Sequence, residues 1–388
     1  MSRFRDALAG RDLSAVAEVK RRSPSAGDLR SDADPALLAS SFDRAGAAAI
    51  SIIVDEAFGG SLDDLRAARG ATRRPLLAKG FFRTEEDLVA LRRAGADAAL
   101  LILRDLDDDL ARGLQEHARQ LGMDALVEAH DAGELDRAVA LGADPIGINA
   151  RDLSTFQINR EAQLALVAEA PRDRVVIAES GIEHRSQGVE AELAGAEAIL
   201  VGSALMRAPD PAVRLAELAG RPLVKICGLT REHDVAGVAE AGADFAGFIL
   251  AESPRRVSAP LDVPETLRSV SVFVGAVREV SSDFVQLYQK ENGHRSRDGL
   301  LLQNQATVAK ILDLPWESED DGHWVRAAEI ARGERIVLSG GLTPSNVAEA
   351  VQTVRPWCVD VSRGVESSPG FKDHGKVREF VSAVRGAA

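Results

Sequence analysis

An Ala-Gly-Ala turn recurs along this chain, each time after a helical stretch and before an apolar run. It stands in RAGAAAISIIV, RRAGADAALLIL, LAGAEAILVG and AEAGADFAGFIL, and ALGADPIGIN has the same turn with Leu in place of the first Ala. Repetition of one short phrase at regular spacing indicates a single supersecondary unit that is copied many times. The chain is therefore limited to repetitive folds in which helices and strands alternate.

The segments between these turns predict buried parallel strands. The apolar runs are short, rich in β-branched residues and unbroken by alternation, which is typical of strands covered on both faces. Amphipathic segments such as EEDLVALRR and AGELDRAVAL separate them, so the period of roughly 25 residues fits one βα unit. Eight such strands lie between Val16 and Ala204: VAEVK, AISIIVD, LLAKG, ALLILR, ALVEAH, IGINA, VVIAES and ILVGSA.

Eight consecutive βα units favour a closed (β/α)8 barrel, or TIM barrel, with its chemistry on loops at the carboxyl ends of the strands. An open doubly wound sheet is the alternative, but such sheets normally have a Gly-rich first turn, and none follows VAEVK. RAPDPAVRLAELAGRP predicts a last helix and a short link, after which the pattern restarts at VKICG. We therefore predict an α/β protein of two tandem TIM barrels, residues 1–219 and 220–388.

Composition excludes several classes of protein. The 388 residues carry a formal net charge of -13 and only 4% are aromatic, which argues against a nucleic-acid binder. No apolar run is long enough to span a bilayer and the first residues show no apolar signal core, so we expect a cytoplasmic protein without a membrane partner. Two cysteines and no Cys/His cluster of zinc spacing give no indication of a disulfide framework or a metal. The oligomeric state stays open, and a monomer fits the sequence.

Polar residues follow nearly every strand of the first predicted barrel. A single Glu or Lys at a strand end often forms only a solvated ion pair, but the same arrangement in nearly every unit favours one shared pocket. Two lysines and several glutamates in a half-buried mouth would shift each other's pKa values, which acid and base catalysis exploits. These residues are Glu18, Lys20, Ser23, Lys79, Glu128, Asn149, Arg151, Glu179, Ser180, Gly181, Gly202 and Ser203.

Residues 16–218 resemble the indole-3-glycerol phosphate synthase family. The segments that carry the resemblance are EVKRRSPSAGDLR, DEAFGGSLDDLRAAR, LVEAHD, GINARDLSTF, AESGI and LVGSALM. The resemblance implies decarboxylating ring closure of 1-(2-carboxyphenylamino)-1-deoxyribulose 5-phosphate to indole-3-glycerol phosphate, with no cofactor. Relatives usually have Asp where this chain has Gly80, and a longer helical extension before the first strand.

The same resemblance implies a role for each polar residue of the mouth. Lys79 would be the general acid for the substrate's carbonyl oxygen, and Glu128 the acid or base of the later dehydration. We expect the two lysines to make each other easier to deprotonate, because neighbouring ammonium groups repel. Lys20, paired with Glu18, would hold the leaving carboxylate; Asn149, Arg151 and Glu179 would orient the anthranilate and hydroxyl groups; Phe58 would form an apolar wall; Ser23, Ser180, Gly181, Gly202 and Ser203 would bind the phosphate.

From Leu223 the chain resembles the phosphoribosylanthranilate isomerase family, in VKICGLTREHD, GADFAGFILAESPRRVS, LSGGLTPSNV, VDVSRGVE and PGFKD. The resemblance implies an Amadori isomerisation of N-(5-phosphoribosyl)anthranilate to the substrate of the first reaction. The whole chain thus resembles fused tryptophan-biosynthesis enzymes. Cys227 would be the general base, with a thiol pKa that we expect the barrel mouth to lower, although most unpaired cysteines are small buried hydrophobes. Asp313 would be the acid, Arg255 would contact the anthranilate or shield the pocket, and Gly340, Gly341 and Gly364 would bind the phosphate. Arg363 stands where relatives have Ser, and its guanidinium fork would replace lost phosphate contacts.

The middle of the second half departs from this pattern. Tyr288 stands where the family has a His in its fourth strand. We predict instead a helix over SSDFVQLYQKENG, capped by Ser282 or Asp283, with Phe284, Leu287 and Tyr288 on one face. LLLQN would then be strand four, which leaves about seven strands.

Three functional hypotheses remain open. The acidic loop ESEDDGH after Asp313 would repel a phosphate. Either the second half has reworked its substrate end, giving a bifunctional enzyme, or it is a non-catalytic domain fused to an active synthase. A phosphate-ligand sensor on barrel scaffolds is the third hypothesis, because a fold does not determine a function.

Overall fold

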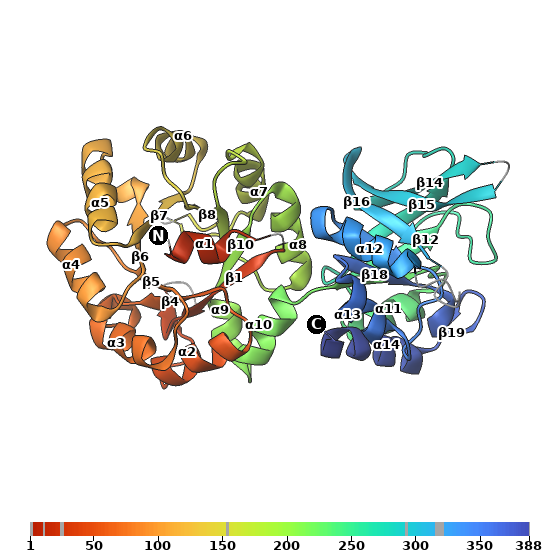
Figure 1. Ribbon diagram of the computed structural model, residues 1–388, viewed down its shortest axis with the longest axis horizontal. Helices are drawn as coiled ribbons and strands as arrows, with labels where there is room; N and C mark the ends of the chain where they lie inside the picture. The colour runs from red at the N-terminus through yellow and green to blue at the C-terminus, as the bar shows by residue number, and fades with distance from the viewer. Residues whose placement is uncertain are drawn as a thin grey trace. The chain divides into compact units, whose positions relative to one another are not determined.

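The computed structural model describes residues 3–10, 12–23, 27–152, 155–291, 294–314 and 322–387. The chain forms two compact units, Met1–Ala219 and Gly220–Ala388. Each unit is built around a closed barrel of eight strands (Figure 1). The prediction of two tandem barrels, the second irregular in its middle, is confirmed.

All eight strands of the first barrel are parallel, and β1 pairs with both β4 and β10 to close it. The strands are β1 (Ser14–Val19), β4 (Ala49–Ile53), β5 (Leu76–Lys79), β6 (Ala98–Ile102), β7 (Asp124–Ala129), β8 (Ile146–Asn149), β9 (Val176–Glu179) and β10 (Ala198–Val201). Two short strands, β2 (Arg22–Ser23) and β3 (Gly27–Asp28), form a hairpin after β1.

Helices surround the first barrel and bury their apolar faces against it (Figure 1). They are α2 (Pro35–Arg44), α3 (Leu62–Ala71), α4 (Glu85–Ala94), α5 (Asp108–Gln120), α6 (Ala132–Ala140), α7 (Arg160–Glu169), α8 (Arg185–Ala194), α9 (Ser203–Arg207) and α10 (Pro211–Ala219).

The recurring Ala-Gly-Ala phrase marks the ends of helices. Gly95 follows α4 with a φ of 105°, and Gly46, Gly142, Gly195 and Gly242 also have positive φ. Glycine reaches this region without a steric penalty, so the helix can stop there and the chain can turn into the next buried strand. The repeat in the sequence is therefore the repeat of one helix terminus.

A short helix, α1 (Arg3–Leu8), lies across one end of the first barrel (Figure 1). Phe4 and Leu8 are completely buried among the residues that fill the barrel. The backbone N of Phe4 donates to Asp124 Oδ2 at 2.8 Å, and Arg5 Nε lies 3.0 Å from Asp144 Oδ2. Because these aspartates lie where β7 and β8 begin, α1 covers the amino-terminal end and leaves the carboxyl-terminal end as the mouth.

The second barrel contains one reversed strand. Its strands are β11 (Leu223–Cys227), β12 (Phe245–Ile249), β13 (Arg268–Val274), β14 (Phe284–Glu291), β15 (His294–Gln303), β16 (Ala306–Asp313), β17 (Ile336–Ser339) and β18 (Cys358–Val361). β15 runs antiparallel to both β14 and β16, whereas the other neighbouring strands pair in parallel. The barrel still closes, through pairing of β11 with β18.

The predicted helix over SSDFVQLYQKENG, residues 281–293, is wrong, because Phe284–Glu291 is strand β14; the last two residues of the segment lie outside the described residues. Phe284, Gln286 and Tyr288 alternate as buried residues with the half-buried Val285 and Leu287. This alternation has the period of a strand that packs on both faces, and it competes with the helical spacing of the same apolar residues. The count of about seven strands is wrong for the same reason: LLLQN belongs to the fifth strand, β15, and the barrel has eight.

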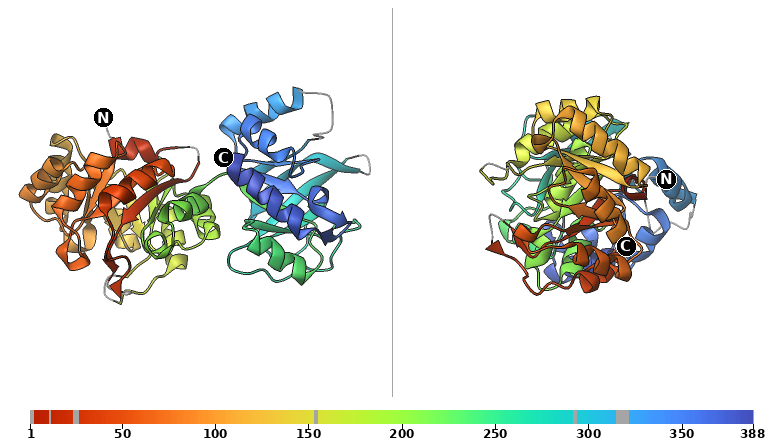
Figure 2. Two further views of the ribbon diagram at one scale, coloured as in Figure 1. Left: turned by 90° about the horizontal axis from the view of Figure 1, so that it is seen from below. Right: turned by 90° about the vertical axis from the view of Figure 1, so that its left-hand side faces the viewer.

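Strands β14, β15 and β16 form a meander that replaces two βα units. Asn304 and Gln305, both with positive φ, connect β15 to β16 in a two-residue hairpin turn. Figure 1 shows the meander on one side of this unit, and in the left view of Figure 2 the β14–β15 hairpin projects at its edge. The α-helices described in this unit are α11 (Glu232–Glu240), α12 (Gly322–Gly333), α13 (Val347–Val354) and α14 (His374–Ala387).

Among the described residues of the two units, no helix combines the length and apolar character needed to cross a membrane.

Candidate active sites

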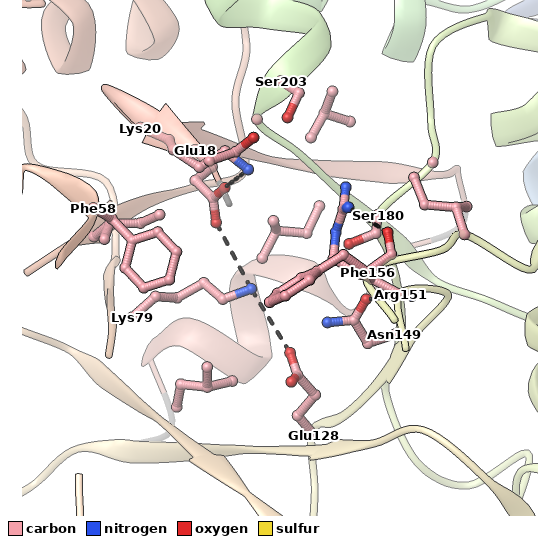
Figure 3. Close-up of a pocket in the computed structure, with 18 of the residues that line it drawn as sticks. Glu18, Lys20, Phe58, Lys79, Glu128, Asn149, Arg151, Phe156, Ser180 and Ser203 are labelled. Carbon is pink, nitrogen blue, oxygen red and sulfur yellow. Dashed lines mark hydrogen bonds and ion pairs between the residues drawn. The ribbon is translucent and has the colours of Figure 1, made fainter. Parts of the chain in front are cut away.

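The carboxyl-terminal ends of the first barrel's strands surround a cavity of about 440 Å³. Most of the residues predicted for this mouth line it, and Figure 3 shows their side chains directed at a common space. The lining includes Glu18, Lys20, Ser23, Phe58, Lys79, Glu128, Asn149, Arg151, Ser180, Gly181, Gly202 and Ser203.

Lys79, the last residue of β5, lies at the centre of this cavity (Figure 3). Its Nζ is 2.6 Å from Glu179 Oε2, 3.7 Å from Glu18 Oε2 and 3.8 Å from Glu128 Oε2. Lys20 Nζ lies 3.0 Å from the other oxygen of Glu18. Three buried carboxyl groups from three different strands therefore surround one ammonium group.

The expectation that the lysines would make each other easier to deprotonate is wrong for Lys79. Burial acts to lower the pKa of Lys79, but the nearby carboxyl groups of Glu179, Glu18 and Glu128 raise it by a larger amount. Its pKa therefore lies well above the ordinary lysine value. The neighbouring carboxylates outnumber the one neighbouring ammonium group, and opposite charges favour the charged form. Lys79 is consequently protonated at every physiological pH.

The pKa values of the Glu128 and Glu179 carboxyl groups are shifted in opposite directions. Burial, together with the nearby Glu128 carboxylate, raises the pKa of Glu179 to about 8 despite the opposing effect of Lys79. Burial also acts to raise the pKa of Glu128, but His130 and Lys79 lower it to about 2. At neutral pH one of these neighbouring groups is thus ionised while the other holds a proton, an arrangement suited to acid and base chemistry.

His130 contacts the Glu128 carboxylate, and the sequence analysis did not predict this residue. Its Nε2 lies 3.3 Å from Glu128 Oε1 and its Nδ1 lies 2.9 Å from Glu134 Oε2, and Arg104 Nε lies 3.2 Å from Glu134 Oε1. Burial lowers the pKa of His130, but these two carboxylates raise it to about 9. The alternation of side chains along a strand would have predicted this residue, because Glu128 and His130 are two positions apart.

Glu179 is not among the residues that line the cavity. Its side chain is completely buried and contacts Lys79, so the predicted role of orienting the anthranilate does not fit its position in the free enzyme. A Cβ on Gly147, in the neighbouring strand β8, would come within 2.1 Å of Glu179 Oε1. The glycine therefore provides the space that this carboxyl group occupies.

Glycines also shape the end of the cavity that was predicted to bind phosphate. Ser180 and Gly181, directly after β9, both have positive φ. A Cβ on Gly202, directly after β10, would lie 2.4 Å from Glu18 Oε1. Any larger residue there would displace the carboxylate that pairs with Lys20.

Aromatic side chains that were not predicted also line the first cavity. Phe81 follows Lys79 by two positions, and its ring centroid lies 6.4 Å from that of Phe58. Phe156 lines the same cavity, and its carbonyl accepts a hydrogen bond from Arg151 Nη1 at 3.0 Å. These rings provide the apolar surface that a flat aryl substrate requires.

At Gly80, where relatives usually have Asp, the space for a side chain is taken by a neighbouring residue. A Cβ on Gly80 would lie 2.9 Å from Phe82 Cζ. The Phe82 ring therefore occupies the space of a side chain at this position.

The second barrel has a cavity of about 570 Å³ at the same end of its strands. All the residues predicted for this half line it, and they come from β11, from the loop after β12 and from the ends of β16, β17 and β18. They are Cys227, Arg255, Asp313, Gly340, Gly341, Arg363 and Gly364.

Cys227 lies beside a buried ion pair. Lys225 Nζ is 2.9 Å from Asp360 Oδ2, and both side chains are almost completely buried. Burial raises the pKa of the Cys227 thiol, and the nearby Lys225 only partly opposes this effect. The expectation of a lowered thiol pKa is therefore wrong for the free enzyme, because the positive charge of Lys225 is already balanced by Asp360.

Arg255 is held by a carboxylate of the same unit. Its Nε and Nη2 form a bidentate pair with Glu366 at 2.7 to 3.1 Å, and Lys372 Nζ lies 2.8 Å from the same carboxylate. Two cations thus share one anion beside the cavity. The predicted contact of Arg255 with the anthranilate would require part of this pairing to break.

Backbone turns form the opposite side of the second cavity. Gly340 and Gly341 have φ of 100° and 70°, and a Cβ on Gly340 would lie 2.0 Å from the carbonyl oxygen of Leu314. Gly364 has similarly little space, since its Cβ would lie 2.0 Å from the carbonyl oxygen of Leu342. The acidic loop predicted to repel phosphate, residues 317–323, lies outside the residues whose side chains the structure describes.

Comparison with known proteins identifies both halves of the chain. Residues 1–218 match the family of indole-3-glycerol phosphate synthase, and residues 321–383 match that of N-(5'phosphoribosyl)anthranilate isomerase. The indole-3-glycerol phosphate synthase of Nocardioides sp. is 50% identical over 51% of this chain and 76% of its own length. The tryptophan biosynthesis protein TrpCF of Yersinia pestis is 33% identical over 98% of this chain and 87% of its own length.

One solved structure is a phosphoribosyl anthranilate isomerase in complex with reduced 1-(o-carboxyphenylamino)-1-deoxyribulose 5-phosphate. It is 27% identical to this chain, with a TM-score of 0.33, and the match covers 43% of this chain and 100% of that one. The two family matches and the relative that is similar along almost the whole length agree with each other. The chain therefore belongs to the family of fused tryptophan-biosynthesis enzymes that join an indole-3-glycerol phosphate synthase to a phosphoribosylanthranilate isomerase.

Proposed function

We propose that the first cavity closes the indole ring and that the second cavity performs the preceding Amadori isomerisation, with the residue roles given below. The observation that carries the first assignment is the position of Lys79, a protonated lysine among three buried carboxyl groups at the centre of an aromatic-lined mouth. The substrates would be small phosphorylated anthranilate-ribose compounds, and we propose that the enzyme acts in the cytoplasm without a cofactor.

Ring closure needs an acid at the carbonyl oxygen of the open-chain sugar. In our proposal the aryl carbon that bears the carboxylate attacks the carbonyl carbon while Lys79 transfers its proton to the carbonyl oxygen, which becomes a hydroxyl group. The carboxylate then leaves as carbon dioxide, and its bonding electrons restore the aromatic ring. Lys20, which is paired with Glu18 at 3.0 Å, would hold this carboxylate until it leaves.

Loss of water completes the indole. Glu128 has a pKa of about 2, so it is ionised and suited to accept a proton from the ring carbon next to the nitrogen. It then passes this proton to the hydroxyl group, which departs as water. Asn149 Oδ1 accepts a hydrogen bond from the backbone N of Arg151 at 2.9 Å, and this contact orients the turn that would position the substrate's hydroxyl groups. The turns at Ser180 and Ser203 would hold the phosphate on backbone N–H groups.

The second cavity combines an acid with a base, as an Amadori rearrangement requires. Asp313 would protonate the ring oxygen of the ribose so that the carbon–oxygen bond breaks, and Cys227 as a thiolate would remove the proton from the neighbouring carbon. The enol that results becomes the ketone when its carbon next to the nitrogen takes up a proton. Gly340, Gly341, Gly364 and Arg363 would bind the phosphate, with the guanidinium fork of Arg363 supplying positive charge.

Reciprocal inactivation of the two cavities in the full-length chain tests this proposal. We expect Lys79→Ala to lower the rate of ring closure at least about a thousandfold and to leave isomerisation unchanged, and Cys227→Ala to do the reverse. Each variant thus serves as the folding control for the other. Undiminished ring closure in Lys79→Ala would remove its assigned role, and a parent chain that closes the ring but does not isomerise would favour a non-catalytic second unit.

A further inference from the structure

The reversed strand brings an arginine to the second cavity from an unusual direction. Parallel strands reach a barrel mouth with their last residues, but β15 is antiparallel to its neighbours and reaches it with its first residues. Arg295, the second residue of β15, pairs in register with Lys290 near the end of β14 and lines the cavity together with Cys227 and Asp313.

Two neighbouring strands hold the Arg295 side chain. Arg295 Nη2 is hydrogen-bonded and ion-paired to Asp313 Oδ2 at the end of β16. Its Cζ lies 4.2 Å from the centroid of the Tyr288 ring on β14. Gln286 Nε2 donates to the Tyr288 hydroxyl at 2.8 Å, which fixes that ring in the wall of the cavity. The guanidinium is therefore presented over an aromatic face beside the proposed acid.

Arg295 is more exposed than three other cations near the proposed base, Arg255, Lys225 and Lys372. Its side chain is 42% exposed, whereas the side chains of Arg255, Lys225 and Lys372 are 14%, 1% and 0% exposed. Those three are committed to the buried carboxylates of Glu366 and Asp360. Exchange of Asp313 for another anion on a half-exposed guanidinium costs little desolvation, whereas uncovering a buried ion pair costs much more.

The position of Arg295 also suits one of the substrate's two anionic groups better than the other. The strand order is β11 to β18 around the barrel, so β14 stands across from β18 and β15 across from β11. Arg363 and the glycine turns that we assign to the phosphate follow β17 and β18. Arg295 projects from β15, two strands from β17 and three from β18, and it lies over the Tyr288 ring, against which an aryl group can pack.

We propose that Arg295 is the side chain that recognises the anthranilate carboxylate in the second cavity. This inference rests on the isomerase function proposed above. In the free enzyme the Arg295 guanidinium is paired with Asp313. When the substrate binds, its carboxylate replaces Asp313 as the partner of Arg295. Asp313 is then released next to the ribose ring, where it can act as the acid once it has taken up a proton from solvent, so recognition of the carboxylate and freeing of the Asp313 side chain are one event.

Binding of a matched pair of ligands to the full-length chain tests this proposal. The first ligand is reduced 1-(o-carboxyphenylamino)-1-deoxyribulose 5-phosphate, and the second is the same compound without its carboxylate. Their inhibition constants against isomerase turnover report the second cavity alone. We expect Arg295→Gln to raise the inhibition constant of the carboxylated ligand by about tenfold to one-hundredfold and that of the other ligand by less than about threefold. Arg295→Lys, which keeps the charge but loses the fork, should give an intermediate loss.

Two controls separate recognition from indirect effects. Arg297→Gln removes an exposed arginine from the same strand and should change neither constant. By calorimetry, the carboxylated ligand should also bind more weakly to the double variant Asp313→Asn/Arg295→Gln than to Asp313→Asn, where no Asp313 carboxylate remains to repel it.

Equal weakening of both ligands by Arg295→Gln, or no weakening of either, would overturn the proposal. If the parent chain lacked isomerase turnover, the proposed function would fail separately. The calorimetric titration of parent and Arg295→Gln with both ligands would still decide the role of Arg295, because the two proteins have the same first cavity and differ only in the second.

Discussion

Glu179 Oε2 lies 2.6 Å from Lys79 Nζ, and the carboxyl group is completely buried beneath the first cavity. The charge of Glu179 therefore acts on the proposed acid at the shortest range of any group in the site. Because burial raises the pKa of Glu179 to about 8, this charge appears only in mildly alkaline solution. The acid strength of the site is thus coupled to a residue that the substrate need not touch.

The kcat/KM of ring closure should fall as the pH rises above about 8. Ionised Glu179 adds a negative charge beside Lys79 and strengthens the hold of Lys79 on its proton. In Glu179→Gln, which resembles the protonated carboxyl group, this alkaline decline in kcat/KM should disappear while the rate near pH 6 to 7 stays within about tenfold of the parent. A decline of the same shape in both proteins would show that another group titrates there.

Gly147→Ala should damage the synthase by moving Glu179. The added methyl group would lie 2.1 Å from Glu179 Oε1, so either the carboxyl group or strand β8 must shift. We expect a loss of stability of about 1–3 kcal/mol and a fall in the rate of ring closure, measured by denaturant unfolding and by assay. Gly113→Ala, in helix α5 where a Cβ meets nothing within 4 Å, is the matched control and should change neither quantity adversely. An unaffected Gly147→Ala variant would mean that Glu179 does not need its observed position.

The stability conferred by His130 should depend on pH. Its folded-state pKa of about 9 is above its ordinary value of 6.5, so the stabilisation is complete below about pH 6.5 and is lost as the pH rises through about 9. His130→Asn should therefore lower the Tm of the first unit more at about pH 6 than at about pH 10. The three tryptophans, at positions 316, 324 and 357, all lie in the second unit, so residual synthase activity after heating is the measurement for the first. A loss of Tm that does not vary with pH would contradict the charged pairing with Glu128 and Glu134.

The isomerase should accelerate with rising pH. Burial raises the pKa of Cys227, so only a small fraction of the thiol is ionised near neutrality, and that fraction grows about tenfold for each pH unit. We expect log kcat/KM for isomerisation to rise with a slope of about one across the neutral and mildly alkaline range. Cys227→Ser, whose hydroxyl group does not ionise in this range, should lose this rise together with at least about a thousandfold of the rate. A pH-independent parent rate would point to a different base.

The first barrel was predictable because each βα unit repeats the same local chemistry. A glycine such as Gly95 ends a helix, an apolar run forms a strand, and a polar residue such as Lys79 ends that strand at the mouth. The second barrel follows this rule at Cys227 and Asp313. It breaks the rule between residues 284 and 313, where apolar residues at Phe284 and Tyr288 fit a helix and a strand equally well and the pairing with distant strands decides between them.

The protonation states were less predictable than the positions. The sequence brings Lys20 and Lys79 to one mouth, but it does not show that three carboxyl groups lie within 3.8 Å of Lys79 Nζ. Arg295 escaped prediction because a search for polar residues at the carboxyl ends of strands overlooks a strand that runs the other way.

The β14–β16 meander also has a consequence for how quickly the second unit acquires its structure. A βα crossover must close a loop of a dozen or more residues before its strands meet, whereas β15 and β16 meet across the two residues Asn304 and Gln305. Local pairing of this kind lowers contact order, and hairpins form within about 1–10 μs. We therefore expect the meander to serve as an early nucleus onto which the remaining parallel strands assemble, so that the most irregular part of the barrel is the first to fold.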